Sequence, residues 1–207
     1  MRPLHSLSAL ATAMLVLSGC VAAPLIGAGV EATRAVTEER STGQQLKDTE
    51  IQLTLNDKFI KHSARLFGDV STTVIEGRVL LTGSVANRED KIAATQLTWE
   101  TPGVTEVTDE LTVARDSGAR AYAEDAWISN QLRVQLLADS AIASQNYNVE
   151  TVDKVVHVTG LARSGAELGR VLDRASGVPG VARVVSHVLT IDDPRRIAAQ
   201  TPQQTGG

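Results

Sequence analysis

The sequence is poor in the residues on which several common kinds of site depend. Cys20 is the one cysteine among 207 residues, so an internal disulfide framework and a cysteine-based zinc site are both excluded. The four histidines lie far apart in the sequence and none belongs to an HExxH motif, so no metal site is expected. Aromatic residues make up only 3%, so the core is expected to consist of Val, Leu, Ile and Ala.

Basic residues are too few for a nucleic-acid-binding protein. Lys and Arg number 20 against 24 Asp and Glu, the net charge is −4, and the basic residues form no long run. A phosphate backbone is bound by a basic surface, so no nucleic-acid partner is expected. Hydrophobic residues nevertheless reach 43%, which exceeds what a disordered chain contains, and the length suffices for one or two folded domains.

The first nineteen residues have the features of an export signal. Arg2 supplies a positive charge, and residues 7–17 form an uncharged stretch that is too short to span about 30 Å of hydrocarbon as a helix. Residues 17–20 read Leu-Ser-Gly-Cys, which resembles a bacterial lipobox whose thiol receives a diacylglycerol. An ordinary signal peptide that contains a cysteine is the alternative. We predict a lipoprotein signal peptide over residues 1–19 and lipidation of Cys20.

A lipidated Cys20 would hold the mature chain to a membrane, facing the periplasm. In enteric-type bacteria an Asp at the next position resembles an inner-membrane retention signal. Val21 stands there instead, so the outer membrane is the expected location. Small, apolar and then polar residues follow, and residues 20–45 are predicted to form a lipidated tether.

The remainder of the chain repeats itself at an offset of 77 residues. Residues 47–114 align without a gap with residues 124–191; Val-Leu-Leu-Thr-Gly at 79–83 matches Val-His-Val-Thr-Gly at 156–160, and a Pro-Gly-Val motif recurs in the same register. Such self-similarity indicates a tandem duplication of a module of about 70 residues. The predicted domains are one module over 46–115, a second over 122–192 and a disordered tail over 193–207.

Each copy predicts the same order of elements. In the first copy Ile51, Leu55 and Phe59 are spaced as one face of a helix. A hairpin with Gly77 in its turn follows, and then a β-α-β unit whose parallel strands require a right-handed crossover. Its expected elements are strands 70–75 and 78–85, a helix 88–100 capped by Asn87, and a strand 104–113. We predict an α+β fold in which each α-β-β-α-β module places two helices on one face of a three-stranded mixed sheet.

The module resembles the BON domain. The resemblance is carried by the Val-x-(Leu/Val)-x-Gly segment, by the Pro-Gly-Val that follows a helix and by the alternating last strand, and it covers nearly the whole mature chain twice over. Together with the lipobox, it makes the chain similar to dual BON-domain outer-membrane lipoproteins. Residues 153–154, Asp-Lys, replace the hairpin glycine in the second copy, and Asp109 and Ser186 stand where such modules often have Asn.

The two copies differ on the first helix. Trp127, Val134 and Ala138 replace charged residues of the first copy, and their spacing places them on a stripe about 130° from the core face. The first copy carries 11 acidic against 7 basic residues, whereas the second is nearly neutral, so an anionic lipid surface would repel the first copy. Arg133 is expected to meet a phosphate while the indole enters the lipid interface. The predicted phospholipid-binding residues are Trp127, Asn130, Gln131, Arg133, Val134, Leu137 and Ala138.

Structural roles compete with these assignments. Trp127 alternatively packs on the first module, and Leu137, which has an apolar counterpart in the first copy, fits a packing role. Gly83 and Gly160 are expected to be structural glycines that permit close approach of the backbone. His157 is expected on a strand that faces a partly wet surface, with no catalytic role because no nucleophile or carboxylate pairs with it by spacing.

Three classes of function follow, in order of preference. The first is a lipid-anchored outer-membrane protein that binds anionic phospholipid and supports envelope integrity. The second is an adaptor for a protein of outer-membrane assembly or cell division, with Trp127 as its anchor. An enzyme ranks third, since no cluster of polar groups that suits catalysis is visible in the sequence, and neither a catalytic residue nor a cofactor is predicted.

Overall fold

A computed structural model describes residues 40–114 and 118–196 of the chain. Both of these segments belong to one compact unit, Thr37–Gly207. The predicted signal peptide and Cys20 lie outside the described residues. Within the described part, every helix is too short or too polar to cross a bilayer.

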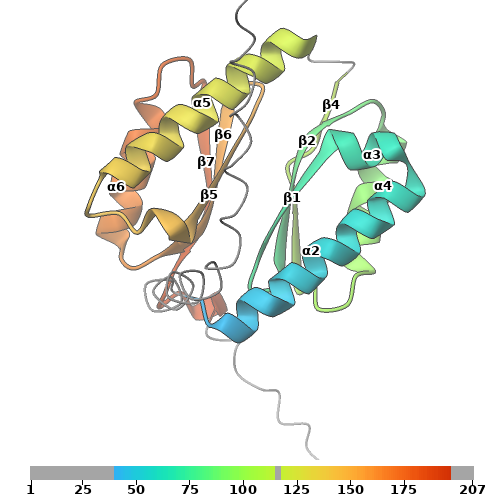
Figure 1. Ribbon diagram of the computed structural model, residues 1–207, viewed down its shortest axis with the longest axis horizontal. Helices are drawn as coiled ribbons and strands as arrows, with labels where there is room; N and C mark the ends of the chain where they lie inside the picture. The colour runs from blue at the N-terminus through green and yellow to red at the C-terminus, as the bar shows by residue number, and fades with distance from the viewer. Residues whose placement is uncertain (1–39, 115–117, 197–207) are drawn as a thin grey trace, which may run out of the picture. The chain divides into compact units, whose positions relative to one another are not determined.

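The first module is a mixed sheet with helices on one face (Figure 1). Strand β1 pairs antiparallel with β2, and β2 pairs parallel with both β3 and the short β4. This is the predicted arrangement, with one helical turn added before the sheet. The elements are α2 (Thr42–His62), α3 (Ala64–Asp69), β1 (Val70–Ile75), β2 (Arg78–Val85), α4 (Arg88–Trp99), β3 (Glu106–Asp109) and β4 (Thr112–Val113).

The second module repeats this topology with the order β5-β6-β7, in which β5 is antiparallel and β7 parallel to β6. Its last strand is continuous, whereas the first module divides the equivalent strand into β3 and β4. The elements are α5 (Gly118–Ala138), the 3-10 helix η1 (Ser144–Asn146), β5 (Tyr147–Val152), β6 (Val155–Ala162), α6 (Gly165–Ser176) and β7 (Arg183–Thr190).

Local hydrogen bonds explain where the structure departs from the predicted elements. Helix α2 begins inside the predicted tether because Ser41 and Gln44 form a reciprocal capping box. The predicted single strand 104–113 is interrupted because the carboxylate of Asp109 accepts a hydrogen bond from the backbone N–H of Leu111, at 2.9 Å. Neither α3 nor η1 was predicted from the sequence.

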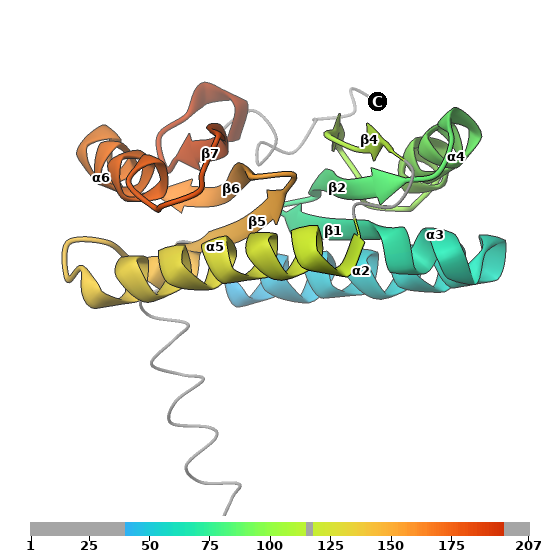
Figure 2. The same ribbon diagram turned by 90° about the horizontal axis from the view of Figure 1, so that it is seen from above.

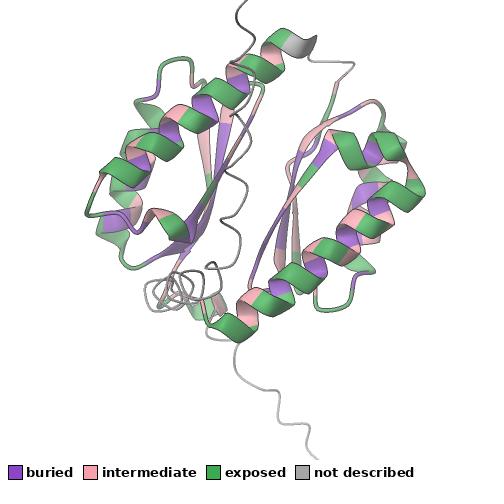
Figure 3. Cartoon of the chain, in the orientation of Figure 1, coloured by how far each residue is buried: buried purple, intermediate pink, exposed green. Residues whose placement is uncertain are grey.

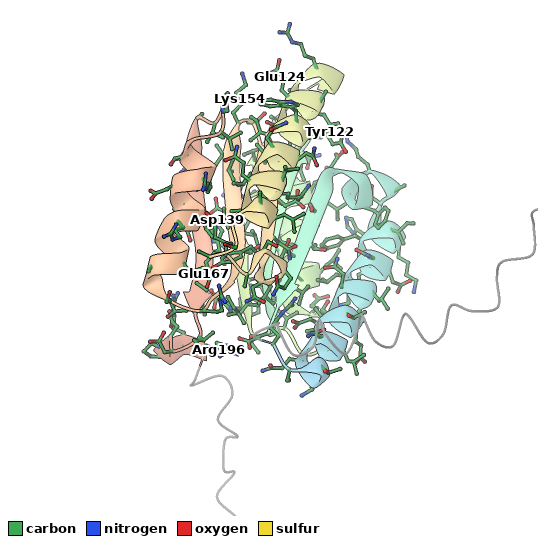
Figure 4. The ribbon with its side chains drawn as sticks, turned by 60° about the vertical axis from the view of Figure 1, so that its left-hand side comes forward. Tyr122, Glu124, Asp139, Lys154, Glu167 and Arg196 are labelled. Carbon is green, nitrogen blue, oxygen red and sulfur yellow. The ribbon has the colours of Figure 1, made fainter. Side chains whose placement is uncertain are left out.

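The predicted disordered tail is wrong at its first residues. Residues 193–196 are described, and Arg196 pairs with Glu76 of the first module at 2.9 Å between Nε and Oε2 (Figure 4). Both side chains are largely buried, 13% and 7% exposed. Arg196 also donates a hydrogen bond to the carbonyl of Ile191, which attaches the end of the described chain to the fold.

Each first helix is tied to the hairpin turn by one buried aspartate. Asp125 accepts hydrogen bonds from the backbone N–H groups of Asp153 and Lys154, at 2.8 and 2.9 Å. Asp48 does the same for the turn of the first module. Lys154 takes a φ of 64° although it replaces the glycine of the first copy, and the two hydrogen bonds offset a strain of roughly 1–2 kcal/mol.

The helix-free faces of the two sheets contact each other within the compact unit. Ile75 from the first module and Leu161 and Leu189 from the second form one buried cluster. Figure 1 shows the helices of each module on the other side of its sheet, and in Figure 2 α6 and α4 lie at opposite ends of the view. His157 is only 4% exposed on this inner face, so the expected partly wet surface is wrong.

Gly83 and Gly160 stand where a strand passes close to the preceding chain, as predicted. A Cβ on Gly160 would lie 2.2 Å from the carbonyl oxygen of Asn146, and its φ is 153°. Gly83 shows the same crowding against Asp69, at 2.1 Å. Since the nearest atom is a backbone carbonyl oxygen in both cases, no side-chain rotation would relieve the clash.

We predict that Gly160→Val lowers the free energy of unfolding of the second module by about 2–4 kcal/mol, because a β-branched residue must displace backbone. Urea denaturation measures the loss. Gly165→Ala is the control, since a Cβ there meets no atom within 4 Å. Equal stability of the Gly160→Val variant and the wild type would contradict the packing argument.

Candidate functional site

The outer face of α5 carries a continuous apolar surface, which we call the α5 stripe. Trp127, Val134 and Leu137 are 49%, 55% and 75% exposed. On the opposite face of the same helix Ile128, Leu132 and Leu136 are at most 2% exposed and belong to the core. The alternation is visible along α5 in Figure 3. Because the core face of α5 is buried, the opposite face, which carries the indole of Trp127, is exposed to solvent.

The remaining predicted binding residues lie on or beside the α5 stripe. Asn130, Arg133 and Ala138 are exposed, and Gln131 is half-buried at the edge toward the core. Leu137 is the most exposed of the large apolar residues on this face. The packing role predicted for it, because the equivalent residue Ile60 is also apolar, is therefore wrong. Six of the seven predicted side chains thus share one exposed helix face.

The indole of Trp127 borders a shallow apolar depression of about 370 Å³. Ile128, Pro179 and Gly180 line it together with side chains at the start of α5. All of its lining residues belong to the second module, so the alternative in which Trp127 fills an interface with the first module does not describe this structure.

Basic groups surround the depression. Arg120 and Lys154 both pair with Glu124, at 3.0 and 3.4 Å, and these contacts lower the pKa of its carboxyl group (Figure 4). Two cations therefore face one carboxylate at the rim, which leaves an excess of positive charge beside the indole. Sequence analysis missed both cations; the Lys in a hairpin turn where the first copy has glycine was the available signal.

Arg133 is only partly free to meet a ligand. Its guanidinium donates a hydrogen bond to the carbonyl of Val149 and lies 3.9 Å from Glu150. Burial raises the pKa of Glu150, and the nearby guanidinium opposes that rise. The side chain remains 53% exposed, so the expected phosphate contact would add to these contacts within the module.

The first module exposes apolar residues on its own first helix, which the sequence comparison overlooked. Leu46, Leu53 and Ile60 are 67%, 65% and 53% exposed, and their spacing of seven places them on one face of α2. Acidic residues accompany this face: Glu50 and Asp57 stand where the second module has Trp127 and Val134. Exposed apolar area alone therefore does not distinguish the modules, whereas the indole and the sign of the neighbouring charge do.

The fold and the repeated motifs define a family. The BON domain model matches residues 47–115 and again residues 124–191. The chain therefore belongs to the BON-domain proteins and contains two copies of the domain.

Relatives extend this similarity beyond the domain itself. The chain is 31% identical over 191 residues to outer membrane lipoprotein DolP of Haemophilus influenzae, covering 92% of this chain and 98% of that protein. An uncharacterised protein of Anaplasma centrale is 34% identical over 144 residues, covering 69% and 94% of the two chains. Osmotically-inducible protein Y of Escherichia coli is 29% identical over 150 residues, covering 72% and 75%.

Neighbouring substitutions on α5 test which face is the core. We expect Trp127→Glu to change the free energy of unfolding by about 1 kcal/mol or less, because the first module already carries Glu50 there. Ile128→Glu should unfold the second module, because it buries an unpaired carboxylate. Thermal melts of the two variants measure the contrast, and equal destabilisation would place Trp127 in the core.

Proposed function

We propose that the chain is a lipid-anchored protein of the outer membrane that faces the periplasm. In this proposal it binds anionic phospholipid through the α5 stripe and supports the integrity of the envelope. The role is that of a binding module and not of an enzyme. The observation that carries the proposal is the solvent-exposed indole of Trp127, which lies between apolar side chains and two cations at the rim of a depression.

The composition of this face matches a lipid–water interface. Trp is favoured at the level of the headgroups, where its ring is partly buried and its N–H remains hydrated. Arg120 and Lys154 are close enough to the indole to meet a phosphate while Val134 and Leu137 contact acyl chains. Basic side chains near an anionic membrane contribute about 1 kcal/mol each.

The energetics require a second attachment. Burial of a patch of this size contributes roughly 2–4 kcal/mol, so binding from free solution is weak and requires a high lipid concentration. A lipid anchor would supply the missing part by keeping the α5 stripe at a high effective concentration beside the bilayer. The lipobox-like residues 17–20 provide such an anchor at Cys20, and the relative from Haemophilus influenzae is named as an outer membrane lipoprotein.

Vesicle co-sedimentation tests the lipid-binding face. A chain that begins at residue 21 should bind vesicles containing phosphatidylglycerol and should not bind vesicles of phosphatidylcholine alone. Trp127→Glu should abolish most of the binding, because it removes the indole and brings a carboxylate to the phosphates.

The matched control is Trp99→Glu, because Trp99 is 54% exposed on the first module. It should bind as the wild type does. A folded Trp127→Glu variant that still binds would exclude the α5 stripe as the lipid site and favour the adaptor function. Loss of binding in Leu53→Glu alone would move the site to α2.

Lipidation has its own test. We expect a Cys20→Ala chain to fold but to lose stable association with the outer membrane, because the acyl chains have no attachment atom. Separation of membrane and periplasmic fractions, followed by detection of the chain, measures this. Retention of the processed variant in the outer membrane would show that anchoring does not depend on Cys20.

A further inference from the structure

Three potential metal ligands meet at the contact between the two sheets. Glu110, His157 and His187 each offer one atom, and these atoms all lie within 4.8 Å of one another. His187 Nε2 is 3.5 Å from Glu110 Oε1. The two imidazole rings are stacked, with centroids 5.9 Å apart and planes 7° apart. We call these residues the His–Glu cluster.

The repeat explains how residues so far apart in sequence meet. Glu110 and His187 are equivalent positions in the two modules, separated by the offset of 77 residues; Glu110 directly follows β3, and His187 lies within β7. His157 joins them because β6 and β7 are parallel and His187 lies opposite Thr159, two residues beyond His157 on the same face. The cluster therefore contains ligands from both modules.

The ring nitrogens lack the partners that buried polar atoms normally have. Among the described residues, no hydrogen bond reaches His157 Nδ1 or His187 Nε2, although both atoms are buried. His157 as a whole is 4% exposed. His187 Nε2 has the carboxylate of Glu110 at 3.5 Å, whereas His157 Nδ1 has no hydrogen-bond partner. A buried nitrogen without a partner costs about 1–3 kcal/mol, so its place in this cluster calls for an explanation.

Acidic and basic side chains both lie near the His–Glu cluster, and Arg78 and Arg195 line the cavity beside it. Glu110 and Glu106 place negative charge near His187, whereas Arg183 places a positive charge near His157. A cavity of about 120 Å³ beside His187, also lined by Glu106 and Thr159, has room for a water molecule.

We propose that the His–Glu cluster binds one divalent transition-metal ion, with Zn²⁺ as the preferred ion. Two imidazole nitrogens and one carboxylate oxygen are a common zinc ligand set, and water from the adjacent cavity completes a tetrahedron. Ligand atoms at about 2.0–2.2 Å from zinc lie about 3.4 Å apart, which the pair from Glu110 and His187 already satisfies. The distances between the other ligand atoms shorten when the stacked rings turn so that the lone pairs of both rings point at one ion.

A metal at this place would link the two modules. Its ligands are distributed between Glu110 on one side and the two histidines on the other, so the ion stabilises the folded arrangement in which both sheets face each other. The α5 stripe lies on the other side of the second sheet and contributes no ligand. Metal binding and lipid binding are therefore expected to be independent.

Titration of the metal-free full chain in detergent with Co²⁺ and then with Zn²⁺ tests the proposal. We expect one equivalent of Co²⁺ to produce the visible absorption of a tetrahedral site, Zn²⁺ to displace it, and the melting temperature to rise with Zn²⁺ concentration. Glu110→Gln and His187→Gln should each weaken binding at least about tenfold.

His157→Leu is the matched variant, since Leu80 occupies the equivalent position of the first module with the same burial, 4% exposed. It should keep the fold and lose the metal. His62→Gln, which changes an exposed histidine of α2, should bind as the wild type does. Failure of the wild type to bind either ion stoichiometrically would overturn the proposal. Binding that survives all three cluster substitutions would also overturn it.

Discussion

Burial of one face of α5 against its sheet is the constraint on which the account of this protein depends. Ile128, Leu132 and Leu136 enter the core at helical spacing, so the residues on the opposite face of α5, Trp127, Val134 and Leu137 among them, are exposed. Asp125, two residues before Trp127 on the same helix, accepts a hydrogen bond from the backbone of Lys154 in the hairpin turn, which places Lys154 beside Trp127. The position of the indole and of its basic neighbour thus both follow from how the second module packs.

The repeat made much of the fold predictable. Two aligned copies show which apolar positions are shared, and most of these positions are the core in both modules, as Leu55 and Leu132 illustrate at 0% exposure each; Ile60 and Leu137 are a shared pair that is exposed. The strands 70–75 and 78–85 and the cap at Asn87 agree with the structure because alternation, turn glycine and capping are local signals. The same comparison identified most of the exposed face of α5 through Trp127.

Features that depend on contacts between distant segments could not be predicted from the sequence. The contact of Arg196 with Glu76 joins residues that are 120 positions apart in the sequence. The start of α2 is different: its capping box is a local signal, but it was missed because Ser41 and Gln44 lie within a polar stretch. His157 was misplaced because its surroundings are set by the other module, whose sheet covers it. No spacing rule within one copy indicates which residues of the other copy will lie opposite.

The central claim is that the α5 stripe is the surface that enters a bilayer. Amide chemical shifts of the unlipidated chain, followed during titration with phosphatidylglycerol micelles, test it most directly because they locate a site and establish its existence together. The account predicts shifts concentrated along α5 around Trp127, Val134 and Leu137, with α2 unaffected. Shifts confined to α2, or no change at saturating lipid, would contradict it.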